Sequence, residues 1–149
     1  MSSKVIGALV LASAVAGPLA AAGAAASAGQ RTTPVTVASS KYGRVLFDGK
    51  GRSLYLFAKD RGGRSSCYGA CAKAWPPLLT KSAPHGAKGA HMGLLGTTRR
   101  RDGRLQVTYA GHPLYGFAHD TQRGQITCQN VSQFGGRWLV VTPAGRAVH

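Results

Sequence analysis

Two decapeptides, GRSLYLFAKD at residues 51–60 and GHPLYGFAHD at residues 111–120, share six of their ten residues at an offset of sixty positions. Both contain a Leu-Tyr pair, a phenylalanine two residues after the tyrosine, and a final aspartate. The chain has only four acidic residues, so half of them occupy this one repeated position. The fold prediction therefore starts from an internal duplication.

The similarity continues on both sides of the decapeptides. Gly43-Arg44 aligns with Gly103-Arg104, and small insertions then align Gly63 with Gly124, Cys67 with Cys128 and Trp75 with Trp138. We predict one compact domain over residues 35–149, preceded by a signal peptide. Its parts are a signal peptide (1–28), a linker and first strand (29–40), repeat 1 (41–79), a connecting loop and strand (80–100) and repeat 2 (101–149).

Each repeat is predicted to form a strand, a turn and a second strand. Runs rich in β-branched and aromatic residues flank Gly-containing turns, a pattern that is typical of hairpins. The predicted strands are 35–37, 44–47, 53–57, 105–109, 114–117 and 138–141, the turns are 48–51 and 110–113, and a short helix is predicted at 70–74 before Pro76-Pro77. Residues 80–93 are predicted to be a flexible loop.

The side-chain alternation of the second strand predicts how the repeats pack. Tyr55 and Phe57 lie on one face and Leu54 and Leu56 on the other, and in repeat 2 Tyr115 and Phe117 share a face. Because an isolated hairpin buries too little surface to be stable, the two repeats must share a core. The predicted fold is a mainly β, small antiparallel domain of two pseudo-symmetric repeats, with one short helix near the Cys-x-x-x-Cys segment.

The N-terminus resembles a secretory signal. Lys4 precedes a long uncharged run that ends at Ala26-Ser27-Ala28, a small-x-small site of the kind that signal peptidase accepts. We predict cleavage after Ala28 and a secreted or envelope-associated protein; the alternative is an uncleaved anchor, since the run is long enough to span a membrane. The mature form is predicted to have no transmembrane span.

The charge of the chain is strongly positive, with 19 Lys and Arg residues against four aspartates. Removal of the signal would delete only Lys4 from this set and leave a net charge of +14. Such an excess favours contact with phosphate polymers, extracellular DNA or acidic glycans. The run Arg99-Arg100-Arg101 has no base-reading geometry by itself, so specific recognition of nucleic acid is not expected.

Three cysteines in an exported protein indicate one disulfide and one remaining thiol. Cys67 and Cys71 are close enough in sequence to pair, which leaves Cys128 unpaired, although pairing of Cys128 with either of them is an alternative. The protein is predicted to be a monomer, with a Cys128-linked dimer as an alternative.

Several coupled motifs resemble one bacterial family. Tyr55-x-Phe57-x-x-Asp60, Tyr115-x-Phe117-x-x-Asp120, CxxxCxxxWPP at 67–77 and DGxxQVTYxGxPLYxF at 102–117 are similar to secreted repeats of unknown function, or predicted lipoproteins with a Yx(FWY)xxD motif. The resemblance implies a source among the high-GC Gram-positive bacteria, that is, an actinobacterial one. It implies no reaction, ligand or cofactor. Many members begin with a lipobox cysteine, whereas this chain has no cysteine before Cys67.

The repeated aspartates have two interpretations. Asp60 and Asp120 are weak candidates for the paired carboxylates of a secreted hydrolase, with His119 as an acid/base candidate. Each aspartate also follows a strand and precedes a Gly-containing turn, where a carboxylate accepts local N–H groups. The structural interpretation is favoured, because acid/base chemistry needs two different environments and a symmetric duplication supplies two similar ones.

The aromatic motif residues are expected in the core. Tyr55, Phe57, Tyr115 and Phe117 follow a period of two, which favours burial over a stacking platform for sugars or bases, and Trp75 and Trp138 are predicted to be paired anchors. No metal site or cofactor is predicted, because the histidines and cysteines lack the usual ligand spacings.

The sequence thus favours a non-enzymatic exported module that binds an anionic envelope polymer or acidic partner through a basic surface. The alternatives are a hydrolase that uses Asp60 and Asp120, and a metal- or redox-linked module outside the cytoplasm.

Overall fold

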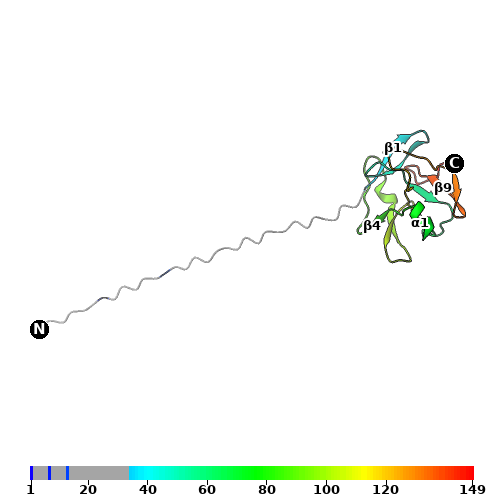
Figure 1. Ribbon diagram of the computed structural model, residues 1–149. Coiled ribbons are helices and arrows are strands. Elements are labelled where there is room, and N and C mark those ends of the chain that lie inside the picture. Colours follow the sequence, from blue (N-terminus) through cyan, green and yellow to red (C-terminus); the bar gives the residue numbers. More distant parts are fainter. Residues whose placement is uncertain (2–6, 8–12, 14–33) are drawn as a thin grey trace.

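The computed structural model describes residues 1, 7, 13 and 34–149 (Figure 1). The predicted cleavage site after Ala28 lies outside the described residues. The described part contains nine strands, one short α-helix and one 3-10 helix. These elements are β1 (Val35–Ser40), β2 (Gly43–Asp48), β3 (Tyr55–Phe57), α1 (Ala70–Ala74), β4 (Leu79–Thr80), η1 (Met92–Leu94), β5 (Leu95–Arg99), β6 (Leu105–Tyr109), β7 (His112–Pro113), β8 (Val131–Gln133) and β9 (Gly136–Val140).

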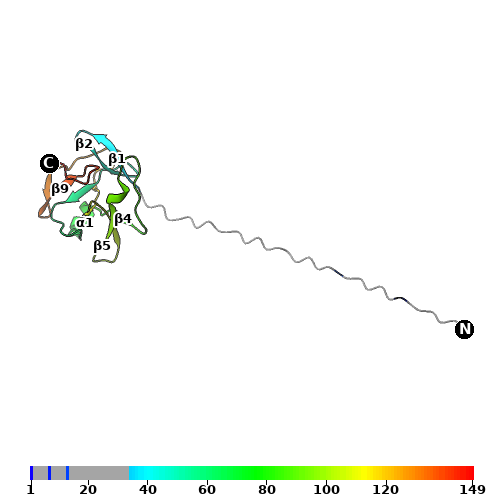
Figure 2. The same cartoon turned by 180° about the vertical axis from the view of Figure 1, so that it is seen from behind.

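The strands form three small antiparallel sheets. β1 pairs with β2, β9 lies between β3 and β8, and β6 lies between β4 and β5 with β7 also paired to it. The C-terminus lies beside β9 in both views (Figures 1 and 2). The predicted fold class is therefore confirmed: the domain is mainly β and antiparallel, with its short helix at the predicted place.

The alternating side chains of β3 divide the interior into two clusters. Tyr55 and Phe57 belong to an aromatic core with Trp75 and Trp138, whereas Leu54 and Leu56 belong to an aliphatic core. Each cluster contains residues from both repeats, so neither repeat encloses a core of its own. This agrees with the predicted face assignment and with the expectation of a shared core.

The two repeats meet through their tyrosine backbones. The N–H of Tyr55 donates to the carbonyl of Tyr115 at 2.8 Å, and the N–H of Tyr115 donates to the carbonyl of Tyr55 at 2.9 Å. Three residues further on, Ala58 and Ala118 each donate to a carbonyl of the opposite repeat, at Arg137 and Ala74 respectively. This reciprocal pattern relates the repeats by an approximate two-fold axis at the tyrosine pair.

One predicted strand does not form as a full element. Residues 114–117 make only isolated bridges at Tyr115, to Tyr55 and to Pro77, whereas their repeat-1 counterparts form β3. The reason is the partner segment, because Pro76 and Pro77 have no N–H to donate to a ladder. β9, which occupies the equivalent place beside β3, has no proline.

The sequence pattern missed one strand and one contact of the predicted loop. β8 is a short edge strand in a Gln- and Asn-containing stretch that has no strand signal. The predicted loop at 80–93 contacts β1, since Val35 donates to the carbonyl of His85 and accepts from the N–H of Ala87.

Four aromatic rings form a column at the centre of the aromatic core. Phe57 stacks on Trp138 at 4.0 Å between ring centroids, Trp138 stacks on Trp75 at 4.0 Å, and Trp75 contacts Phe117 at 4.6 Å. The two tryptophan planes differ by only 4°. The rings come alternately from repeat 1 and repeat 2, so the column joins the repeats side chain by side chain.

Truncation of one tryptophan should therefore destabilise the whole domain. We expect Trp75→Ala to lower the free energy of unfolding by about 3–5 kcal/mol, because it opens a cavity between two rings of the column. The matched control is Phe134→Ala, since Phe134 is an aromatic residue with 43% of its surface exposed, and it should cost less than about 1 kcal/mol. Urea unfolding measures both, and equal losses would contradict a central role of the column.

Candidate functional site

The motif tyrosines and aspartates form two hydrogen bonds that cross between the repeats. The hydroxyl of Tyr55 donates to Oδ2 of Asp120 at 2.5 Å. The hydroxyl of Tyr115 donates to Oδ2 of Asp60 at 2.7 Å. Each aspartate is thus bonded by the tyrosine of the other repeat, although its own repeat supplies a tyrosine five residues earlier.

The backbone explains this exchange. Tyr55 and Tyr115 pair in antiparallel segments of the chain, so the residues after each tyrosine lie beside the residues before the other tyrosine. Both chains then turn, since the N–H of Asp60 donates to the carbonyl of Phe57 and the N–H of Asp120 donates to the carbonyl of Phe117. The turn brings each carboxylate to the hydroxyl of the opposite tyrosine.

Each carboxylate also holds the turn that follows it. Oδ1 of Asp60 accepts from the N–H and the hydroxyl of Ser66, at 2.8 and 2.7 Å. Oδ1 of Asp120 accepts from the N–H and the hydroxyl of Thr127, at 3.2 and 2.5 Å, and its Oδ2 also accepts from Ser53. Ser66 and Thr127 are themselves equivalent in the repeat alignment. The motif is therefore a joint between one repeat's tyrosine and the other repeat's loop.

Burial shapes the ionisation of these groups. Burial raises the pKa of Asp60, and the hydrogen bonds from Tyr115 and Ser66 oppose that rise. Burial also raises the pKa of both Tyr55 and Tyr115 above its ordinary value. The two tyrosines are therefore neutral donors over the physiological pH range, and the carboxylates accept from them.

The weak catalytic candidates are placed in different surroundings. Asp120 is 2% exposed and lines a pocket of about 300 Å³ together with Asp48 and Ser53, and Asp60 is not among the residues that line it. His119 is exposed, and its ring contacts Phe117 at 5.3 Å between centroids. Within the described residues, no group of three or more His, Cys, Asp or Glu side chains is arranged to hold a metal ion.

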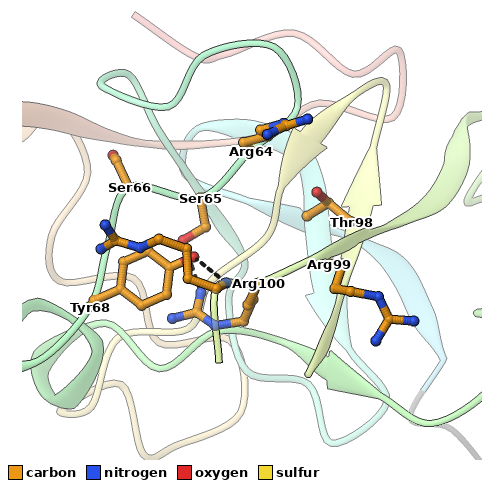
Figure 3. A pocket seen from close by; sticks show the side chains of 8 residues that line it. Arg64, Ser65, Ser66, Tyr68, Thr98, Arg99 and Arg100 are labelled. Carbon is orange, nitrogen blue, oxygen red and sulfur yellow. Dashed lines mark hydrogen bonds between the residues drawn. The ribbon is translucent and has the colours of Figure 1, made fainter. Parts of the chain in front are cut away.

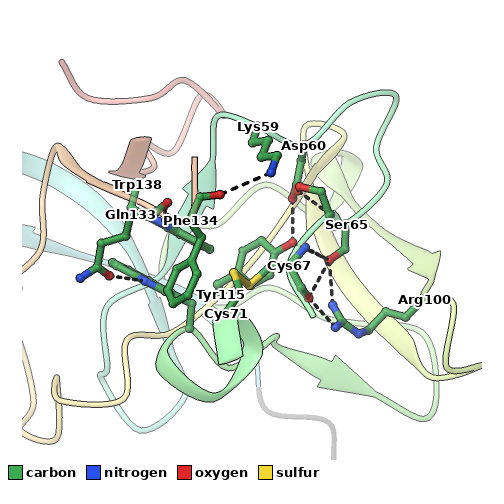
Figure 4. Close-up of a disulfide and its surroundings, with 12 residues drawn as sticks. Lys59, Asp60, Ser65, Cys67, Cys71, Arg100, Tyr115, Gln133, Phe134 and Trp138 are labelled. Atoms are coloured by element: carbon green, nitrogen blue, oxygen red, sulfur yellow. Dashed lines mark hydrogen bonds between the residues drawn. A yellow bond between two sulfur atoms is a disulfide. The ribbon is translucent and has the colours of Figure 1, made fainter. Parts of the chain in front are cut away.

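The Cys67–Cys71 disulfide is present and lies beside Tyr115, and the loop that it closes contacts the buried Arg100 (Figure 4). Arg100 donates from Nη2 to the carbonyl of Cys67 at 2.8 Å and from Nη1 to Oγ of Ser65 at 2.9 Å. The same Oγ lies 2.7 Å from the hydroxyl oxygen of Tyr115. A continuous network thus links Asp60, Tyr115, Ser65 and Arg100.

Cys128 is free and partly exposed, and burial raises the pKa of its thiol. Because Cys67 and Cys71 are bonded to each other, the alternative pairing of Cys128 with either of them is not observed. A Cys128-linked dimer stays a prediction.

A groove of about 630 Å³ opens beside Arg100 (Figure 3). Arg64, Arg99 and Arg101 are exposed along it, whereas Arg100 is only 2% exposed. The guanidinium carbons of Arg100 and Arg101 lie 4.4 and 4.1 Å from the centroid of the Tyr68 ring. We call this feature the arginine groove; it is lined by Arg64, Ser65, Ser66, Tyr68, Thr98, Arg99, Arg100 and Arg101.

The sequence reasoning did not identify the arginine groove or the crossed tyrosine–aspartate bonds. The run at 99–101 is visible in the sequence, but residues 64–68 reach it only through the fold. The aligned hydroxyl residues Ser66 and Thr127 were an available signal for the turn that each aspartate holds, but they do not mark the crossed bonds.

The crossed bonds make a specific prediction about coupling. In double-mutant cycles, Tyr55→Phe and Asp120→Asn should show a coupling free energy of roughly 1.5–3 kcal/mol, and so should Tyr115→Phe with Asp60→Asn. The matched controls are the same four changes combined within a repeat, Tyr55→Phe with Asp60→Asn and Tyr115→Phe with Asp120→Asn, which should be nearly additive. Stronger coupling within repeats than between them would contradict the crossed tyrosine–aspartate bonds.

The buried tyrosines also predict a loss of stability in alkali. Because both native pKa values are raised, their contribution is complete below the ordinary pKa near 10 and is lost as the pH rises through the native values. We expect the free energy of unfolding to fall above about pH 10 by up to roughly 1.4 kcal/mol per pH unit for each phenol. Urea unfolding across this range measures it. The double variant Tyr55→Phe/Tyr115→Phe should give a flatter profile, and an unchanged slope would count against buried neutral phenols.

Comparison with known proteins identifies the family and adds no function. Among the residues that the structure describes, no helix has the length and apolar character needed to cross a membrane. No curated protein and no solved structure matches the chain. The family described as a secreted repeat of unknown function matches residues 36–79 and 96–142, which are close to the two predicted repeats. This description confirms the predicted secretion, and because the match covers more than half of its length, the chain belongs to the family of the secreted repeat of unknown function.

Proposed function

We propose that the secreted chain is a non-enzymatic module that binds an anionic polymer of the cell envelope through its basic side chains. The observation that carries this proposal is that the four aspartates form ion pairs with few of the cations. Asp60 and Asp120 accept from hydroxyl and N–H groups, Asp48 pairs with Arg52, and Asp102 pairs with Arg100 and Arg104. Across residues 34–149, these three arginines alone have a carboxylate within ion-pair distance.

The remaining cations of residues 34–149 therefore have no ion-pair partner to reduce their field. A surface of this kind concentrates polyanions and binds them largely by releasing their counterions. The exposed arginines of the arginine groove supply a place where several such cations lie together. Export brings the protein to a compartment where anionic polymers are abundant.

The hydrolase alternative has less support. Both motif carboxylates are occupied by donors from two directions, and the pocket beside Asp120 does not include Asp60. A nucleophile or general base needs a lone pair that is directed at substrate, and here the lone pairs are directed at protein donors.

Salt dependence tests the proposal. Retention on isolated cell wall or on heparin should fall steeply with added monovalent salt, by roughly 50-fold in affinity between about 50 and 200 mM if about four cations are engaged. An uncharged polysaccharide of similar length serves as the control and should retain nothing. Retention that does not respond to salt would overturn the proposal.

A further inference from the structure

We propose that the arginine groove is a binding site for consecutive phosphodiester groups of a polyol-phosphate polymer. This inference rests on the proposed function and gives it a place and a ligand chemistry. The residues that line the groove carry four guanidinium groups, four hydroxyl groups and no carboxylate. Guanidinium groups match phosphate oxygens with paired N–H donors. The hydroxyl groups of Ser65 and Ser66 are engaged within the protein, so the exposed guanidinium groups are the main donors to a ligand.

The buried Arg100 provides the strongest part of this inference. Its side chain is 0% exposed, and its three hydrogen bonds go to the neutral oxygens of Ser65, Cys67 and Gln106. Asp102 lies 3.6 Å from its Nε, at the outer limit for an ion pair, and this Nε has no hydrogen-bond partner within the described part of the chain.

A buried cation is costly unless an anion compensates it. All the hydrogen-bond acceptors of Arg100 are neutral, and its nearest carboxylate, Asp102, lies 3.6 Å away without a hydrogen bond. Asp60 acts on Arg100 only through space, so the guanidinium group has no carboxylate in direct hydrogen-bond contact. Because the residue lines the groove, an anion bound there would lie beside it. The same hydrogen bonds fix the guanidinium group rigidly, so that little entropy is lost when a ligand binds.

The size and spacing of the site favour a polymer over a single ion. Figure 3 shows Arg64 and Arg99 on one side of Arg100 and Tyr68 on the other, so the charged groups are spread along the groove. Its volume of about 630 Å³ lies within the range of about 300–1,000 Å³ that holds drug-sized ligands. Several cations at separate points along the groove match the repeated negative charges of a polymer ligand.

The chemistry of Tyr68 favours a polymer without bases. Single-stranded nucleic acids bind through stacking on open aromatic faces. Tyr68 is the aromatic residue of the groove, and the guanidinium groups of Arg100 and Arg101 already lie over its ring. The groove therefore offers charge and hydrogen bonds without a free stacking surface, which suits a polyol-phosphate backbone.

The test compares two triple variants of equal charge. Arg64→Gln/Arg99→Gln/Arg101→Gln removes the exposed arginines of the groove. Arg44→Gln/Arg123→Gln/Arg146→Gln removes three exposed arginines that do not line it. Urea midpoints should match the wild type for both triples, because all six side chains are exposed.

Binding is measured by titration calorimetry with poly(glycerol phosphate) of defined length, over a range of salt concentrations. For the groove triple we expect the slope of log K against log salt to fall in magnitude by about 2, and the Kd to rise roughly tenfold or more at moderate salt. For the control triple we expect a slope change below about 0.5 and a Kd within about threefold of wild type. Equal losses in both triples would overturn the groove while leaving the proposed function intact. Absence of salt-sensitive binding in the wild type would overturn the proposed function itself.

Three competitors define the ligand class. Inorganic phosphate should compete weakly, and full competition at millimolar concentration would overturn recognition of consecutive groups. Polyglutamate of equal charge should bind more weakly than poly(glycerol phosphate), and tighter binding would overturn phosphate as the ligand. Single-stranded DNA at equal phosphate concentration should bind no tighter than poly(glycerol phosphate), and a tenfold preference for DNA would replace this proposal with nucleic-acid recognition.

Discussion

The pair of hydrogen bonds that cross between Tyr55 and Asp120 and between Tyr115 and Asp60 is the constraint on which the rest of the structure depends. Neither repeat can satisfy these groups alone, because each carboxylate needs a hydroxyl that the other repeat supplies. A buried carboxylate or phenol without its partner costs several kcal/mol. The crossed bonds therefore make the duplication obligatory, and the alternating aromatic column beside them imposes the same requirement on the apolar side chains.

The symmetry is then broken by substitutions at equivalent positions. Ser65 aligns with Ile126, so only repeat 1 places a hydroxyl where it can meet both the Tyr115 hydroxyl and Arg100. The Cys67–Cys71 disulfide closes the loop that contributes the Cys67 carbonyl to the same arginine. Because these features occur in one repeat only, the arginine groove exists once in the domain. Duplication thus supplied the shared core, and divergence of one copy supplied a distinct surface.

Sequence reasoning recovered what depends on local pattern. The alternation in β3 predicted which side chains face which core, and the position of α1 followed from the prolines after it. The crossed bonds could not be predicted from the sequence. The two copies of the motif are the same whether Tyr55 bonds to Asp60 or to Asp120. The shortened strand at 114–117 depended on Pro77 as a spatial neighbour. The groove depended on two segments, 64–68 and 98–101, that are at least thirty residues apart in the sequence. Those facts belong to the tertiary fold and leave no periodic signal.

The placement of the aspartates connects the fold with its surface chemistry. With four acids and many arginines, only a few cations can have a carboxylate partner. Two of the four acids accept hydrogen bonds from tyrosines in the interior instead. The other two act locally: Asp48 holds a turn beside Arg52, and Asp102 pairs with Arg104, which holds the pKa of Asp102 at about 2. Since none of these acids forms an ion pair with Arg64, Arg99 or Arg101, the interactions that join the repeats leave this cluster of arginines without a carboxylate partner. Stability and charge are coupled through this shortage of acids, and Ser65 and Ser66 belong both to the groove and to the hydrogen bonds that join the repeats.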